Sequence, residues 1–123
     1  MLGVSLDQYG FLVQGAFWTV VLSLMGFVGG TIVGLPVALA RISGGWFLCR
    51  AASLYVQFVQ GIPLPVIMFV VYFGVSIYGF DVNALVAAAI AMTLYSSAYL
   101  GEIWKGCIQA VPKTQWEAGE CLA

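Results

Sequence analysis

Five polar side chains crowd one end of an otherwise apolar stretch, and they are the residues best placed to do chemistry. They are Thr93, Ser96, Ser97, Tyr99 and Glu102. At helical spacing the hydroxyls at 93, 96 and 97 share one face, and Tyr99 and Glu102 lie on an adjacent stripe. Polar groups on a membrane helix face inward, so these residues are candidates for the lining of a substrate pathway.

Two interpretations of Glu102 stay open. As the most deeply placed carboxylate, it could contact a substrate or take part in gating. Lys105 follows three residues later, so the two side chains could instead form an ion pair near the end of the helix.

Several kinds of chemistry are excluded by residues that the chain lacks. It contains no His to act as a base or a metal ligand, and the three cysteines match no metal-site spacing. No phosphate-binding Gly-x-x-x-x-Gly-Lys-Ser/Thr loop occurs. The net charge of -1 argues against a nucleic-acid partner. We therefore expect no enzyme, no metal and no cofactor.

The elements that position these residues are three long stretches without charge, at residues 8–40, 51–80 and 82–101. A bilayer core of about 30 Å needs roughly 20 apolar helical residues to cross, so each stretch fits one span. With 63% hydrophobic and 7% charged residues, the chain is too apolar for a soluble globule. We predict an all-α membrane protein whose single transmembrane domain, residues 1–123, has spans at about 15–40, 54–80 and 83–106.

The charges that remain are divided completely between the two sides of this topology. All basic residues fall in the first connection or after the third span: Arg41, Arg50, Lys105 and Lys113. The tail and the second connection hold only Asp7 and Asp81. Because Lys and Arg are retained on the cytoplasmic side, the N-terminus is expected outside, in the periplasm, and the C-terminus in the cytoplasm.

Two backbone features mark the first two spans. Gly26, Gly30 and Gly34 form a stripe of small residues on which another helix can pack closely. In the second span, Gly61, Pro63 and Pro65 interrupt the helical pattern. Residues 46–60 then form either a separate short helix at the cytoplasmic interface or the first part of one long, proline-kinked helix.

The segment 107–123 is more polar and is expected to lie in the cytoplasm. Its Thr114-Gln115-Trp116-Glu117 sequence matches a capping box, in which Thr114 caps the helix and Glu117 bonds back to the Thr114 N–H. We therefore predict a short helix that begins at Thr114.

Here the residues resemble a known family. Glu117-Ala118-Gly119, after a span that ends in residues 99–106, looks like the EAA loop of permease subunits in bacterial ATP-binding-cassette (ABC) importers. The stretches 15–23, 59–64 and 108–118 resemble the branch that takes up polar amino acids. The family pattern usually has Ala where Gly119 stands and Gly where Ala123 stands. Such permeases continue into further spans, so the chain corresponds to an N-terminal portion that ends inside the motif.

The resemblance implies a function and a set of partners. It implies a multi-pass subunit in the inner membrane that carries a polar amino acid, with ATP hydrolysis in a cytoplasmic ATP-binding subunit. The other implied partners are a periplasmic solute-binding protein, a second permease subunit and membrane lipid. The resemblance also implies that the short helix beginning at Thr114 is the coupling helix, which binds in a groove of the ATPase subunit. The residues expected to make this contact are Thr114, Glu117, Ala118 and Gly119.

Two other functions stay open from the residues alone. A small self-contained exporter would need an ionisable group within a span, and only Glu102, near a helix end, could serve. A helical membrane anchor or assembly factor would use a glycine stripe as readily as a transporter does.

Overall fold

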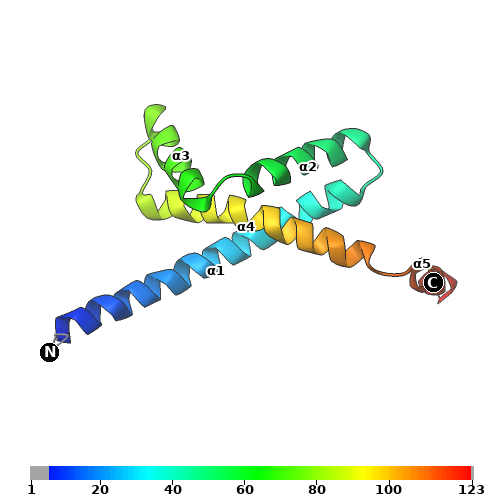
Figure 1. The fold of residues 1–123 in the computed structure, drawn as a ribbon, viewed down its shortest axis with the longest axis horizontal. Coiled ribbons are helices and arrows are strands. Elements are labelled where there is room, and N and C mark those ends of the chain that lie inside the picture. The colour runs from blue at the N-terminus through cyan, green and yellow to red at the C-terminus, as the bar shows by residue number, and fades with distance from the viewer. Residues whose placement is uncertain (1–5, 123) are drawn as a thin grey trace.

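The computed structural model describes residues 6–122, and the chain forms five helices there (Figure 1). They are α1 (Leu6–Ile42), α2 (Trp46–Gln60), α3 (Leu64–Ile77), α4 (Ala84–Gln109) and α5 (Lys113–Leu122). No strand occurs among the described residues, so the all-α prediction is confirmed.

Helix α1 is longer than the span expected from the sequence. Its 37 residues extend roughly 55 Å at 1.5 Å per residue, well beyond a bilayer core of about 30 Å. The helix continues through Pro36 and ends just after Arg41. Its N-terminal part projects beyond the other helices (Figure 1).

Helices α1 and α4 form the main packing interface and run in the same direction. Along this interface Gly26 lies against Met92, and Arg41 pairs with Glu102 further on. The C-terminal ends of α1 and α4 therefore lie toward the same end of the molecule. Asn83 caps the start of α4, where its Oδ1 accepts the Leu85 N–H at 3.0 Å.

Helices α2 and α3 return the chain along α4, and the bend between their axes is 104°. Pro63 has no N–H to continue the helical ladder, and Pro65 suits the first turn of α3. The Gly61 N–H donates to the Gln57 carbonyl and the Ile62 N–H to the Val59 carbonyl, which closes the last turn of α2. Of the two alternatives for residues 46–60, the structure has the separate helix.

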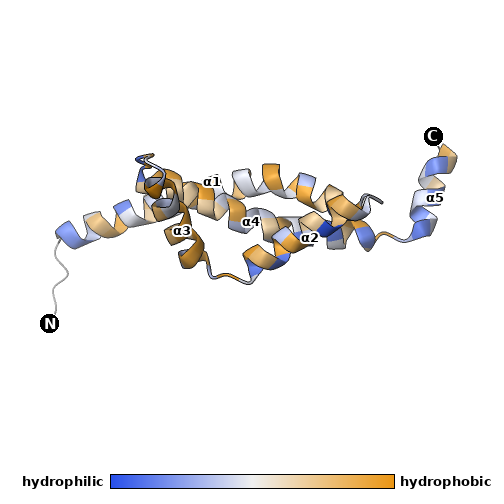
Figure 2. Cartoon of the chain, turned by 90° about the horizontal axis from the view of Figure 1, so that it is seen from above, coloured by the Kyte–Doolittle hydropathy of each residue, from blue (hydrophilic) through white to orange (hydrophobic). Residues whose placement is uncertain are grey.

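The exterior of the helices is largely apolar, and the hydrophilic residues gather mainly near the termini and the α1–α2 corner (Figure 2). By length and composition, α1 and α4 can each cross a membrane, and the bent α2–α3 pair counts as a third crossing if it is one span. The chain is thus a multi-pass membrane protein with two or three candidate spans.

Candidate functional site

The glycine stripe of α1 sets the position of the polar half of α4. A Cβ atom added at Gly29 would stand 2.3 Å from Thr93 Oγ1, and one added at Gly30 would stand 2.5 Å from Ser96 Cβ. At Gly34 the nearest atom would be the Ser97 carbonyl oxygen, at 3.0 Å. The predicted use of this stripe in close helix packing is confirmed.

The three candidate hydroxyls on one face of α4 are divided between two neighbouring helices. Thr93 and Ser96 lie against the glycines of α1. Ser97 is fully buried, and its hydroxyl donates to the Leu94 carbonyl at 2.8 Å. It also shares a hydrogen bond of 2.7 Å with the hydroxyl of Tyr55 on α2. These side chains therefore take part in helix packing at the places where a substrate pathway was predicted.

Tyr99 lies on the more exposed side of α4, beside Tyr95. The Tyr95 hydroxyl donates to that of Tyr99 at 3.2 Å, and the two ring centroids are 4.8 Å apart. Both rings line an open cavity of about 360 Å³ between α1 and α4, to which Ser23 and Ser96 add hydroxyls. This cavity is the part of the predicted pathway region with room for a small polar molecule.

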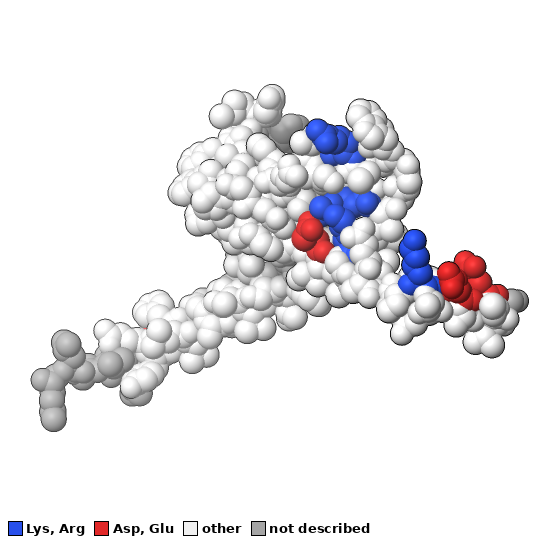
Figure 3. Space-filling model, turned by 45° about the vertical axis from the view of Figure 1, so that its right-hand side comes forward, with Lys and Arg blue, Asp and Glu red and all other residues white. Residues whose placement is uncertain are grey.

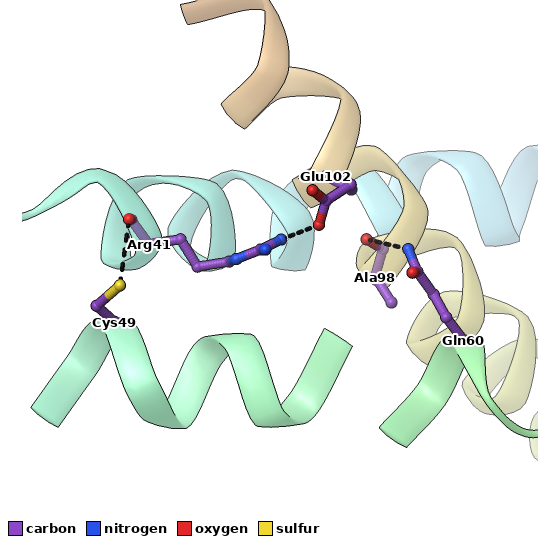
Figure 4. A network of polar contacts seen from close by, with 5 residues as sticks. All are labelled: Arg41, Cys49, Gln60, Ala98 and Glu102. Atoms are coloured by element: carbon purple, nitrogen blue, oxygen red, sulfur yellow. Dashed lines mark hydrogen bonds and ion pairs between the residues drawn. The ribbon is translucent and has the colours of Figure 1, made fainter. Parts of the chain in front are cut away.

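Glu102 forms an ion pair with Arg41 at the end of α1 (Figure 4). The alternative pairing with Lys105 is wrong, because no such ion pair is present among residues 6–122. The parallel packing of α1 on α4 brings the guanidinium to the carboxylate, and a partner one turn along the same helix is not used. The Arg41 side chain is only 8% exposed, whereas that of Glu102 is 47% exposed.

Arg41 is the residue of this site that sequence reasoning missed. In the sequence it is the first charge after the long apolar stretch of α1, and that position indicates only the topology. Two weaker contacts join α2 to the same region (Figure 4). The Cys49 thiol donates to the Arg41 carbonyl, and the Gln60 amide donates to the Ala98 carbonyl, each at 3.5 Å.

Helix α5 stands apart from the other helices. It begins at Lys113, packs against none of α1 to α4, and is exposed along its described length. Thr114, Glu117, Ala118 and Gly119 are therefore all open to a partner.

The predicted capping box is wrong. The Gln115 N–H donates to the Pro112 carbonyl at 3.0 Å, so the helix starts before Thr114. Within the described part of the chain, the side chains of Thr114 and Glu117 make no hydrogen bond. Because Pro112 already provides the first carbonyl, Thr114 lies inside the first turn and does not occupy the cap position.

Most of the charged residues lie toward the end where α1 and α4 terminate; the exceptions are Asp7 in the first turn of α1 and Asp81 before α4. Basic side chains gather there, and the acidic side chains of α5 lie beside them (Figure 3). Among residues 6–122, no three His, Cys, Asp or Glu side chains come together as metal ligands would. The site is thus a set of helix contacts and open surfaces.

No family model matches the chain. It is 36% identical over 119 residues to the probable amino-acid ABC transporter permease protein YckA of Bacillus subtilis (strain 168), a match that covers 97% of this chain and 53% of the relative. It is 31% identical over 113 residues to the glutamine transport system permease protein GlnP of Escherichia coli (strain K12), covering 90% and 52%. The chain spans about half the length of the curated relatives it matches.

A solved structure has the same arrangement of helices. It is a crystal structure of an amino acid ABC transporter with histidines, and the superposition has a TM-score of 0.78 at 28% sequence identity. It covers 98% of this chain and 59% of the other.

Proposed function

We propose that this chain belongs to the transmembrane permease subunit of an importer for a polar amino acid. It is homologous to amino-acid ABC transporter permeases along nearly its whole length. The relatives confirm the resemblance seen in the sequence. The observation that carries the proposal is the match in both sequence and helix arrangement to such permeases. An anchor or a self-contained exporter has no comparable support.

In this function the chain carries no ATPase chemistry of its own. ATP would be hydrolysed in a cytoplasmic ATP-binding subunit, and a solute-binding protein outside the membrane would deliver the amino acid. A second permease subunit would complete the passage. We propose three spans, with the bent α2–α3 pair as one crossing, the N-terminus outside and the C-terminus inside. The separation of the basic residues from Asp7 and Asp81 supports this orientation.

The proposed substrate pathway runs along the polar half of α4. Thr93, Ser96 and Ser97 would shape its wall through their contacts with α1 and α2, and Tyr99 would border the cavity of about 360 Å³. Glu102 uses one carboxylate oxygen for Arg41 and is half exposed, so its other oxygen is open to a passing ammonium group. The α2–α3 break at Gly61, Pro63 and Pro65 would hold α3 against the start of α4.

Helix α5 would be the contact to the ATP-binding subunit. The structure supports this role as well as the resemblance does. A ten-residue helix that packs against none of α1 to α4 is marginal in water and needs a docking surface. Glu117 can pair with a basic group on that surface, and Ala118 and Gly119 allow a close approach.

The test uses the permease co-expressed with its ATP-binding subunit and compares three substitutions. Glu117→Ala should reduce co-purification of the ATPase at least about fivefold, the equivalent of the roughly 1 kcal/mol that separates a contributing contact from a neutral one. Amino-acid uptake should fall with it, and abundance in the membrane should stay normal. Glu117→Gln should also weaken binding, because it removes the negative charge that would pair with a basic group on the ATPase. No capping bond depends on this side chain, so the change does not act through the helix start.

The matched control is Gln115→Ala, because residue 115 lies about 200° around the helix from Glu117 and is equally exposed. It should leave co-purification and uptake unchanged. Normal ATPase binding and uptake in Glu117→Ala would contradict the coupling role of α5.

A further inference from the structure

The corner between α1 and α2 holds an open cavity that lies outside the proposed transport pathway. It is a cavity of about 590 Å³, and its polar lining comes from Ser43, Cys49, Arg50, Ser53 and Gln57. Residues 50, 53 and 57 follow helical spacing along one face of α2, so their side chains converge on the same space. A charged group with two hydrogen-bonding groups in one cavity is an arrangement that suits an anion.

The charge in this cavity is not neutralised within the described part of the chain. Arg50 has no acidic partner there, since the ion pair formed among residues 6–122 joins Arg41 to Glu102. The first turn of α2 contains no acidic residue, and its cap position, Gly45, offers no side-chain oxygen. The open N–H groups of that turn add to the positive potential near Arg50.

Two exposed aromatic residues support a position of this corner at the membrane surface. Trp46 is 79% exposed and Phe47 is 75% exposed, directly after the turn that follows α1. Aromatic side chains, Trp above all, are enriched at the headgroup level of a bilayer, and a long apolar helix such as α1 leaves the membrane at its end. The anion that this cavity would meet at that depth is the phosphate of a lipid headgroup.

We propose that the cavity between α1 and α2 binds the phosphate of an anionic phospholipid, with Arg50 as the charge contact and Ser53 and Gln57 as hydrogen-bond donors. Trp46 and Phe47 would lie among the neighbouring lipids and keep the cavity at headgroup level. The absence of a nearby carboxylate favours a lipid with net negative charge over a zwitterionic one. The lipid site requires only that the chain lies in a membrane, so its test is independent of the proposed transport function.

The experiment measures lipid retention by native mass spectrometry of the purified permease complex, exchanged into either phosphatidylglycerol or phosphatidylcholine. The unchanged protein should retain phosphatidylglycerol preferentially. Arg50→Gln should weaken this retention about fivefold, the effect of one basic residue near an anionic membrane surface. Arg50→Lys should keep most of it, and Ser53→Ala should lower it by a smaller factor.

The matched control is Lys113→Gln, which removes a basic residue from the same end of the molecule but outside the cavity. It should retain phosphatidylglycerol as the unchanged protein does. Equal retention in Arg50→Gln and Lys113→Gln would overturn the site. Displacement of the lipid by millimolar inorganic phosphate would assign the cavity to a soluble anion and would likewise overturn the lipid proposal.

Discussion

Gly30 of α1 and Ser96 of α4 are so close that a single methyl group between them has no room. A Cβ atom at residue 30 would stand 2.5 Å from Ser96 Cβ and 3.1 Å from the Ser96 backbone carbon. The facing atoms are the Cβ and the backbone carbon of Ser96, and no side-chain rotation can move either of them away. This approach fixes how far apart α1 and α4 lie.

The first prediction follows from that contact. Gly30→Ala should destabilise the protein by about 1–3 kcal/mol, the usual cost of overpacking, because α1 must move away from α4. Thermal unfolding in detergent measures the effect. Gly15→Ala is the control on the same helix, since nothing lies within 4 Å of a Cβ at that position. Equal melting temperatures for the two variants would contradict the packing described here.

A second prediction concerns the ion pair. Glu102→Gln should lower stability by about 1–3 kcal/mol, between the values for exposed and buried pairs, because it leaves the buried Arg41 guanidinium without its counter-charge. Adding Arg41→Met should recover part of the loss, since the unpaired charge is then gone. A double-mutant cycle on the unfolding free energy tests this, with Glu120→Gln as an exposed control. Simple additivity of the two changes would show that the pair contributes no coupling.

The hydroxyl of Tyr55 provides a third test. It lies 3.1 Å from the Leu94 carbonyl and 2.7 Å from the Ser97 hydroxyl, and its single proton can be donated to either, so Tyr55→Phe removes contacts that tie α2 to α4. The expected cost is about 0.5–1.5 kcal/mol per hydrogen bond lost. Tyr78→Phe is the matched control, because Tyr78 is 83% exposed. Unfolding curves of the two variants should separate, and overlapping curves would count against a stabilising role for this hydroxyl.

The fourth prediction addresses orientation. An impermeant thiol reagent added to intact cells should leave Cys107 unmodified and should label a cysteine introduced by Asp81→Cys. The reason is that Cys107 lies in the last turn of α4, at the end that the proposed orientation places in the cytoplasm with the four basic residues. Cys107 is exposed, so it should react once the cells are opened. Ready labelling of Cys107 in intact cells would reverse the proposed topology.

The features that could be predicted from the sequence are those that depend on neighbouring residues. The apolar stretches, the interruption at Gly61–Pro65 and the glycine stripe all express local chain geometry or local surface shape. The partner of Glu102 could not be predicted in this way, because Arg41 is 61 residues distant along the chain and meets it only through helix packing.

The error at Thr114 has a different origin. The residue pattern of a capping box is present, but the helix begins before Thr114, where the Pro112 carbonyl accepts the Gln115 N–H. A four-residue motif does not contain that information. The contacts of Thr93 and Ser96 with α1, and of Ser97 with α2, could not be predicted from the sequence either. A polar face indicates that another element covers it but does not identify that element.

The parallel pairing of α1 with α4 affects how the protein is made. At about 5–20 residues per second, the ribosome takes roughly 3–12 s to pass from Arg41 to Glu102, which are 61 residues apart. During that interval the glycine stripe of α1 has no α4 to pack against it. Whatever packs on this stripe first must bind more weakly than α4, or it would prevent α4 from packing there.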